Sequence, residues 1–309
     1  MILATNILEA IGRTPLVGLG KVVPDGHARI VVKLEGANPT GNMKDRMAKA
    51  AIAAAEADGR LRPGGTVVEY TGGSTGASLA LVCAARGYRL RIVTSDAFSA
   101  EKMLSMRAFG AEIILVPSDD GKITEELVRR MIGTAREISR EDGHWWFDQL
   151  NNGDGPTGYH QMGEEIWAQT GGRIEAFVQA VGSAHSLNGV AQALRRHNPR
   201  LHVAAAEPAE SAVLSGGPKG AHRIEGIGIG FAPPHWTPDQ IDEVLSATTE
   251  ESIHMCRRLA REEGIFAGIS SGLNVVAALR VAERLGPEAT VATIMIDSGL
   301  RYLSTDVYR

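Results

Sequence analysis

Lysine is scarce in this chain, and one lysine lies where an amine could be reactive. The chain has 7 lysines against 25 arginines, and only a lysine amine can lose its proton and form an imine with a carbonyl carbon. Lys44 begins a predicted helix, within the segment NPTGNMKDR at 38–46. The positive potential of a helix N-terminus disfavours an ammonium and so favours the free amine. From position alone, a solvated lysine in a first helical turn is the simpler interpretation.

Three glycine-rich turns are candidates for binding anionic groups. They read TGGSTG at 71–76, GSAHS at 182–186 and GISSG at 268–272. Each precedes a predicted helix, and backbone N–H groups at a helix N-terminus attract anions. One such turn alone is weak evidence, because tight strand-to-helix turns use glycine for steric reasons. Three in one chain favour a ligand with separate anionic groups.

The turn TGGSTG is also compatible with a dinucleotide-binding loop of the short-chain dehydrogenase type. Such an enzyme needs a tyrosine and a lysine four residues apart as its acid/base pair. No tyrosine of this chain has a lysine four residues later, and G-x-G-x-x-G does not follow the first predicted strand. The dehydrogenase interpretation is therefore disfavoured.

Composition excludes several other classes of protein. The 309 residues include 36 glycines without a G-X-Y period, and the net charge of -4 predicts no basic surface for nucleic acid or anionic lipid. No apolar run approaches the ~20 residues of a membrane span, and no signal peptide is recognisable. The two cysteines cannot form a disulfide framework, and no Cys/His spacing fits a metal site. We therefore expect a cytoplasmic enzyme without a metal ion.

The candidate residues are carried by an alternation of apolar and amphipathic segments. Predicted strands lie at 29–34, 66–70, 90–94, 112–116, 177–181, 203–206 and 290–296. Predicted helices lie at 44–58, 75–86, 100–109, 124–139, 187–196, 251–263 and 272–285. Strands this apolar are buried on both faces, so the pattern predicts an α/β fold with parallel sheets. Residues 142–159 and 214–237 are expected to be loops.

The segment NPTGNMKDR resembles the cofactor-lysine segment of the fold-type II pyridoxal-phosphate enzymes, in the cysteine synthase and cystathionine β-synthase family. The resemblance extends along nearly the whole chain. Its motifs occur in the family's order: IGRTPL at 11–16, TGGSTG where the family has T-S-G-N-T-G, FDQLNN at 147–152, GEEIW at 163–167, GSAHS where the family has G-T-G-G-T, GIGIGF at 226–231, GISSG, and IDSGLRYLST at 296–305. The ordered set is far more specific than any single member.

The resemblance implies a tryptophan synthase β-like fold. Two three-layer αβα domains with mainly parallel, twisted sheets would hold pyridoxal 5'-phosphate in the cleft between them. A large cofactor-binding domain would comprise residues 1–40 and 146–309, and a smaller, mobile substrate-binding domain residues 41–145. The family also implies a homodimer.

The resemblance further implies a role for each matching residue. Lys44 is the expected Schiff-base lysine and the acid/base that moves the Cα proton. The residues that would bind the cofactor are Lys44, Ser74, Gly182, Ser183, Ala184, His185, Ser186 and Ser298. The hydroxyl of Ser298 would bond the pyridine nitrogen. The residues that would bind the amino-acid substrate are Thr71, Gly72, Ser74, Thr75, Gln149 and Gly228.

Two departures from the family pattern mark a divergent member. Ser74 replaces the family asparagine that bonds the cofactor's ring hydroxyl. Ala184 and His185 replace two glycines of the phosphate loop. Alanine offers its N–H to a phosphate provided that its φ is negative. His185 is either a solvent-facing filler or an additional donor to phosphate or substrate.

The resemblance favours β-replacement on an O-activated L-serine, either O-acetylserine or O-phosphoserine. Sulfide or a thiol would give L-cysteine by way of the Lys44 imine and an aminoacrylate. The alternatives on the same fold are a cystathionine β-synthase or a β-eliminating lyase, such as a cysteine desulfhydrase or a serine/threonine dehydratase. A non-catalytic scaffold or sensor is the alternative from a different class, because Ser74 and the altered phosphate loop depart from the family.

Overall fold

The computed structural model describes residues 3–98, 100–122 and 124–309, which form two compact units. Unit 1 contains the N-terminal residues up to Ile11 and Lys44–Gly158, and unit 2 contains Gly12–Met43 and Tyr159–Arg309. The chain thus passes from unit 2 to unit 1 between Met43 and Lys44. It returns to unit 2 between Gly158 and Tyr159. The predicted domain boundary after residue 40 lies three residues before the crossing at Met43, and the one after residue 145 lies 13 residues before the crossing at Gly158. The N-terminal segment joins the unit opposite to the one predicted.

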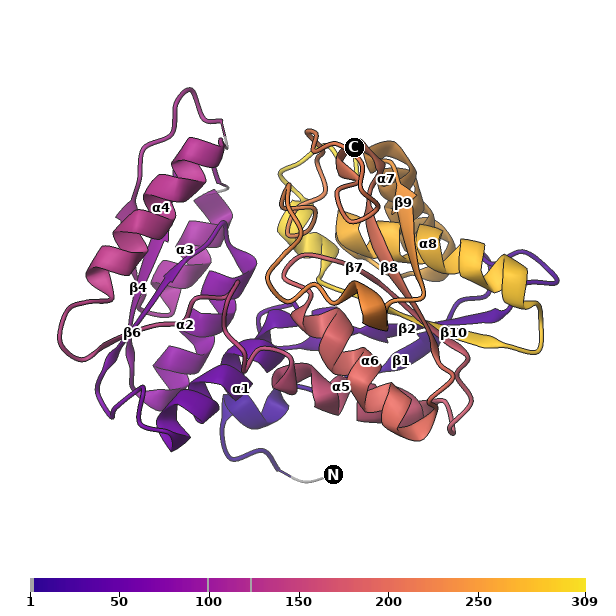
Figure 1. Ribbon diagram of the computed structural model, residues 1–309, viewed down its shortest axis with the longest axis horizontal. Coiled ribbons are helices and arrows are strands. Elements are labelled where there is room, and N and C mark those ends of the chain that lie inside the picture. Colours follow the sequence, from indigo (N-terminus) through magenta and orange to yellow (C-terminus); the bar gives the residue numbers. More distant parts are fainter. Residues whose placement is uncertain (1–2, 99, 123) are drawn as a thin grey trace. The chain divides into compact units, whose positions relative to one another are not determined.

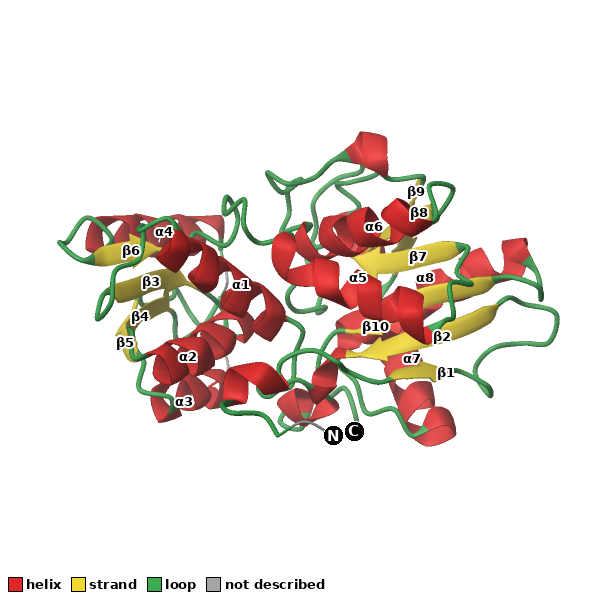
Figure 2. Ribbon diagram, turned by 90° about the horizontal axis from the view of Figure 1, so that it is seen from below, coloured by secondary structure: helices red, strands yellow, loops and turns green. Residues whose placement is uncertain are grey.

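Unit 1 is a four-stranded parallel sheet with helices on both faces. Its strand order is β5-β4-β3-β6. The strands are β3 (Thr66–Tyr70), β4 (Arg89–Thr94), β5 (Glu112–Leu115) and β6 (His144–Trp146), and the helices are α1 (Lys44–Ala57), α2 (Ser74–Arg86), α3 (Ala100–Ala108) and α4 (Glu125–Ile138). Helix α4 covers one face of this sheet, and α2, flanked by α1 and α3, covers the other (Figure 2).

The core of unit 1 explains why its strands are so apolar. Val68 of β3 and Val93 of β4 pack against Leu127 and Met131 of α4, and all four are at most 1% exposed. Helix α4 begins after Thr124, whose hydroxyl accepts the N–H of Leu127. A parallel sheet needs such cover on both faces, because its side chains are buried on both sides.

Unit 2 contains a six-stranded sheet in the order β1-β2-β10-β7-β8-β9. All neighbours are parallel except β1 and β2. The strands are β1 (Leu16–Gly18), β2 (Arg29–Leu34), β7 (Ala176–Ala180), β8 (His202–Pro208), β9 (Glu243–Ala247) and β10 (Thr290–Met295), and the helices are α5 (Thr157–Gln169), α6 (His185–His197), α7 (Thr249–Arg258) and α8 (Ile269–Leu285). Helices α5 and α6 lie on one face of this sheet, and α7 and α8 on the other (Figure 1).

The predicted α/β class with parallel sheets is confirmed, with corrections to individual elements. The expected loop at 142–159 contains the short strand β6 and the first turn of α5. The helix expected at 251–263 is α-helical only to Arg258 and continues as a π-helix over Leu259–Glu263. Strand β9 and most of α5 were not predicted. In the described part of the chain, no helix is both long and apolar enough to cross a membrane.

Candidate active site

Lys44 is the first residue of α1 and follows a segment that is fixed within unit 2. The N–H of Met43 donates to the carbonyl oxygen of Ile296 just beyond β10, at 3.0 Å. The Gly41 carbonyl oxygen accepts the N–H of Ser298, at 2.9 Å. Burial lowers the pKa of the Lys44 amine to about 8, because desolvation penalises the ammonium. About a tenth of this amine is therefore uncharged at pH 7, far more than for an ordinary lysine, and the uncharged amine is the nucleophile.

The turn between β3 and α2 meets Gln149 within unit 1. The hydroxyl of Thr75 donates to Oε1 of Gln149. The Thr71 hydroxyl accepts the N–H of Gly73, at 3.0 Å, which closes the turn on itself. Thr75 of this turn thus contacts Gln149, and both residues belong to the group predicted to bind the substrate carboxylate. The remaining predicted member, Ser74, is the first residue of α2.

Steric contacts explain the glycines of this turn. A Cβ on Gly72 would lie 2.6 Å from the Phe98 ring, and a Cβ on Gly73 would lie 2.3 Å from Cδ of Lys102. Gly73 also has φ of +151°, a conformation that side-chain-bearing residues rarely adopt. Two residues that sequence analysis did not single out, Phe98 and Lys102, therefore lie directly over the turn.

A buried carboxyl group lies next to Gln149. Glu69 of β3 is fully buried, and its Oε2 accepts the backbone N–H of Gln149 at 3.1 Å. Sequence analysis did not identify Glu69 as a site residue. The available signal was its charge within an otherwise apolar predicted strand, directly before the glycine turn.

The turn between β7 and α6 is the predicted phosphate loop, and it depends on a close backbone contact. A Cβ on Gly182 would lie 2.5 Å from the carbonyl oxygen of Gly226. Ser183 and Ser186 are 5% and 7% exposed. The amide of Gln179, itself fully buried in β7, donates to the Ser186 hydroxyl.

The two unusual residues of this loop adopt conformations that the sequence did not reveal. Ala184 has φ of +65° and is the N-cap of α6, so the condition that we set for its N–H to bind a phosphate, a negative φ, is not met. His185 is 1% exposed, so the solvent-facing interpretation is also wrong. Its ring packs against that of His235, with 4.5 Å between ring centroids. His235 is a fourth residue, after Phe98, Lys102 and Glu69, that the sequence did not reveal, since it lies 50 positions from His185.

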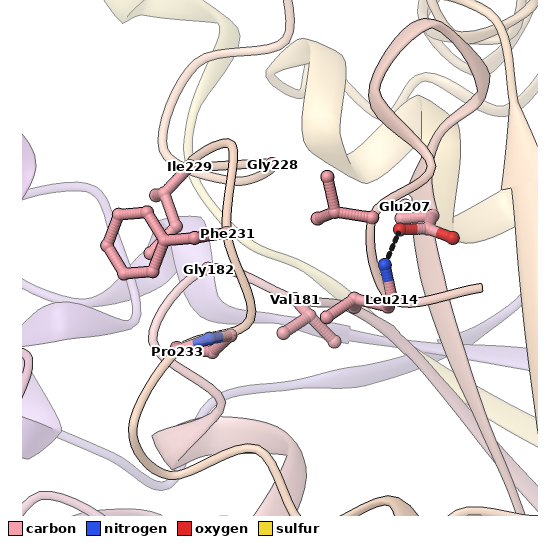
Figure 3. Close-up of a pocket in the computed structure, with 9 residues that line it drawn as sticks. Val181, Gly182, Glu207, Leu214, Gly228, Ile229, Phe231 and Pro233 are labelled. Atoms are coloured by element: carbon pink, nitrogen blue, oxygen red, sulfur yellow. Dashed lines mark hydrogen bonds between the residues drawn. The ribbon is translucent and has the colours of Figure 1, made fainter. Parts of the chain in front are cut away.

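Gly228 lies beside the phosphate loop in unit 2. Its N–H donates to the carbonyl oxygen of Val181 at 3.1 Å, and its φ is +59°. Figure 3 shows the small pocket that forms here, with Gly228 and Phe231 on one loop and Gly182 on the other. The carboxylate of Glu207 closes one side by accepting the Leu214 N–H, at 2.7 Å.

Ser298 follows β10, which is the neighbour of β7 in a parallel pairing, so both candidate segments leave the same edge of the sheet. The hydroxyl oxygen of Ser298 accepts the N–H of Leu300, at 3.3 Å. The serine therefore caps a short helix, as a strand-end serine commonly does. This bond uses the oxygen as an acceptor and leaves the O–H free to act as a donor.

The described residues fit pyridoxal phosphate. Helix α6 begins after Ala184, an N-cap residue whose side chain makes no capping hydrogen bond, and backbone N–H groups at such a helix N-terminus attract an anion such as a phosphate. Lys44 supplies the partly uncharged amine that a carbonyl cofactor needs. The described residues contain no cluster of His, Cys, Asp or Glu that could hold a metal ion. The combination of this fold, an anion-binding turn in each unit and a desolvated lysine is that of a pyridoxal-phosphate enzyme.

Comparisons with known proteins agree with this class. The model of the family described as "Pyridoxal-phosphate dependent enzyme" matches residues 7–297, and the chain belongs to that family. The cysteine synthase of Staphylococcus aureus is 40% identical over 306 residues, which cover 98% of this chain and 96% of that protein.

Solved structures show the same similarity. A cysteine synthase from Entamoeba histolytica matches with a TM-score of 0.93 and 37% identity, covering 99% of this chain and 91% of its own. An O-acetylserine dependent cystathionine beta-synthase from Helicobacter pylori matches with a TM-score of 0.92 and 34% identity over 100% of both chains. The predicted family, fold type, enzyme class and cofactor are confirmed, and the scaffold alternative loses its support.

Proposed function

We propose that this enzyme replaces the β-substituent of an O-activated L-serine with sulfide or a thiol and so forms L-cysteine. The observation that carries the proposal is the Lys44 amine, whose pKa is lowered to about 8 in a chain that has two anion-binding turns. The 40% identity to a cysteine synthase over nearly the full chain supports the choice of reaction. O-acetylserine is the preferred substrate, and O-phosphoserine is the alternative.

Unit 2 supplies the residues that would hold the cofactor. The backbone N–H groups of Gly182, Ser183, His185 and Ser186, with the hydroxyls of the two serines, would bind its phosphate. His185 would add a donor at the N-terminus of α6. The O–H of Ser298 would donate to the ring nitrogen. Pyridoxal phosphate, when bound, supplies the electron sink for the bond broken at Cα.

Unit 1 supplies the residues that would hold the amino acid. Thr71, Gly72, Ser74 and Thr75, together with Gln149, would bind its carboxylate, and Gly228 of unit 2 would line the substrate site. A fixed carboxylate orients the Cα–H bond, which limits the geometries that the base must sample. Nζ of Lys44 would take the Cα proton, since an amine with a pKa near 8 is suited to proton transfer at neutral pH.

Cystathionine formation is the second candidate, and the Helicobacter pylori structure supports it. That enzyme, which its name describes as O-acetylserine dependent, would share the first half of the proposed reaction. The two candidates differ only in the nucleophile. A β-eliminating activity on cysteine, serine or threonine is the remaining alternative, and it would need no nucleophile other than water.

The assembly and the location of the protein belong to the same proposal. We infer a homodimer of cytoplasmic protomers whose partners are the amino acid and the sulfide or thiol. The net charge of -4 favours neither nucleic acid nor an anionic membrane as a partner. The smaller substrate-binding region, predicted at 41–145, is proposed to be mobile.

Absorbance of the purified protein tests the cofactor and the lysine. The protein should take up pyridoxal phosphate and show a visible band that Lys44→Ala abolishes. Lys21→Ala is the matched control, because Lys21 is exposed. Protein that remains colourless after incubation with the cofactor would contradict the proposal.

A spectral screen with four amino acids tests the reaction. O-acetylserine should shift the band, and sulfide should restore it with release of L-cysteine. O-phosphoserine, serine and cysteine identify the other leaving groups, and homocysteine in place of sulfide identifies cystathionine formation. A band that none of the four amino acids shifts would leave the β-replacement proposal without support.

A further inference from the structure

Glu69 is a buried acid that no step of the proposed reaction uses. It is 0% exposed in the middle of the unit 1 sheet. One carboxyl oxygen, Oε2, accepts the backbone N–H of Gln149 at 3.1 Å. The other, Oε1, is buried without a hydrogen-bond partner among the described residues. Burying a carboxyl oxygen without a hydrogen-bond partner destabilises the folded protein. A contribution to folding stability alone therefore does not explain why this position is a glutamate.

The turn that Glu69 contacts has an unusual backbone. Asp148 has φ of +47°, in the left-handed region that disfavours non-glycine residues. Its carbonyl oxygen accepts the N–H groups of Asn151 and Asn152, at 3.0 and 2.9 Å, and its carboxylate accepts the Asn151 side-chain amide. Such a conformation persists only where the surroundings fix it. The bond from the Gln149 N–H to Glu69 joins this turn to β3, beside the backbone bond from the Phe147 N–H to the Val68 carbonyl oxygen at 2.9 Å.

The same turn presents the Gln149 side chain. Gln149 Oε1 accepts the hydroxyl of Thr75, the residue after Ser74 in the proposed carboxylate-binding turn. Thr75 is 3% exposed, so this hydroxyl has little freedom to find another partner. A continuous path of two hydrogen bonds thus runs from Glu69 through Gln149 to Thr75.

The raised pKa of Glu69 is compatible with a position next to the proposed carboxylate-binding turn. Burial raises its pKa well above the usual range, and the negative charge of Asp148 adds to the increase. The N–H groups of Gln149, Tyr70 and Asp148 act in the opposite direction without reversing it. A raised pKa favours the uncharged form of this carboxyl, and in that form it accepts the Gln149 N–H without adding a negative charge near the proposed carboxylate site.

We propose that Glu69 is a positioning residue for the substrate carboxylate, acting through Gln149. It fixes the backbone at Gln149 so that Oε1 of the side chain accepts the Thr75 hydroxyl while the side-chain NH2 group donates to the carboxylate. The inference rests on the proposed function, because it assumes that residues 71–75 and Gln149 bind an amino acid. It predicts an effect on binding of the amino acid and little effect on the chemical step.

Binding titrations on the cofactor-loaded enzyme test this role. The dissociation constant of O-acetylserine, measured from the cofactor band, should rise about tenfold in Glu69→Ala, since a positioned hydrogen bond is lost. The KM should rise with it, while kcat at saturation changes little. Glu69→Gln keeps an uncharged acceptor of the same size and should restore most of the affinity. Glu137→Ala, which removes an exposed carboxylate of the same unit, is the control.

A double-variant cycle separates positioning from general damage to the fold. In a Gln149→Ala background, Glu69→Ala should add little further loss of affinity, because the side chain that it positions is gone. Additive losses in the double variant, or a Glu69→Ala enzyme that binds O-acetylserine as the wild type does, would overturn the inference. Failure of the wild-type enzyme to bind the cofactor or the amino acid would instead contradict the proposed function.

Discussion

The two turns that we propose to bind anions have the same topology but use their residues differently. Each follows a parallel strand and opens a helix that lacks a side-chain cap: residues 71–75 before α2, and residues 182–186 before α6. The first turn has glycine at its N-cap, Gly73, with φ of +151°. The second has alanine at its N-cap, Ala184, with φ of +65°. Both turns therefore have a positive φ at the N-cap, but only the first has glycine there, which adopts a positive φ without steric cost.

Crowding accounts for much of this difference. Side chains lie against the glycines of the first turn, whereas no described side chain crowds Gly182, whose neighbour is a backbone carbonyl. Two features therefore favour glycine at position 73: its positive φ, and the Lys102 side chain, which leaves no room for a Cβ. At 184 glycine is favoured by φ alone, and alanine is tolerated.

The largest expected effect concerns Lys44, which serves the cofactor that the second turn would hold. Its pKa of about 8 means that the amine is mostly protonated and unreactive below that pH. Capture of pyridoxal phosphate by cofactor-free protein should therefore accelerate about tenfold per pH unit up to pH 8 and level off above it. Stopped-flow absorbance measures this rate. A rate independent of pH between 6 and 8 would show that desolvation does not control the amine.

Gly73→Ala tests the first turn and should produce the next largest effect. The new Cβ needs space that Lys102 occupies, and alanine disfavours φ of +151°. Amino-acid binding should weaken by roughly 100-fold, since strain and a clash of this kind each cost about 1–3 kcal/mol. The cofactor should still bind. Titration with O-acetylserine and with cofactor measures the two affinities separately.

Gly133→Ala is the control for Gly73→Ala. Gly133 lies within α4, and nothing would lie within 4 Å of its added Cβ. Alanine in a helix interior should stabilise the protein by about 0.5–1 kcal/mol and leave both affinities unchanged. Equal losses of amino-acid and cofactor binding in Gly73→Ala would mean that the first turn is not specific to the substrate.

Gly182→Ala should have the converse effect on the second turn. Its Cβ would lie 2.5 Å from the backbone oxygen of Gly226, so the two loops must separate. Cofactor affinity should fall by about tenfold, for an overpacking cost near 1–3 kcal/mol. Gly20→Ala is the control, because a Cβ there meets nothing within 4 Å. Equilibrium dialysis of the cofactor gives the affinities, and an unchanged value for Gly182→Ala would contradict the contact.

Ala184→Gly should give the smallest effect and one of opposite sign. Relief of the left-handed conformation, about 1–2 kcal/mol, exceeds the entropy cost of glycine, about 0.5–1 kcal/mol, so the variant should be slightly more stable. Ala191→Gly within the same helix should instead be destabilised by about 1 kcal/mol. Urea denaturation measures both. Destabilisation of Ala184→Gly to the same extent as Ala191→Gly would mean that residue 184 is not left-handed.

The sequence predicted what local patterns control. Strands β2 and β3 have the predicted ends, because each is a compact apolar run between turn residues. Strand β6 was missed since it has only three residues within a polar segment. The grouping of residues 71–75 with Gln149 followed from the family resemblance. The contacts of Gln149 with Glu69 and of His185 with His235 could not be predicted, because each joins residues at least 50 positions apart.

The uncapped start of α6 has a consequence for measurement. The first amides of a helix have no carbonyl partner within it, and no side chain of the N-cap residue replaces that partner here. Deuterium uptake at these amides should therefore fall when an anion binds in the turn. Mass spectrometry of a peptide that contains the start of α6 would therefore detect phosphate binding. This measurement needs no absorbance signal, no enzyme assay and no variant.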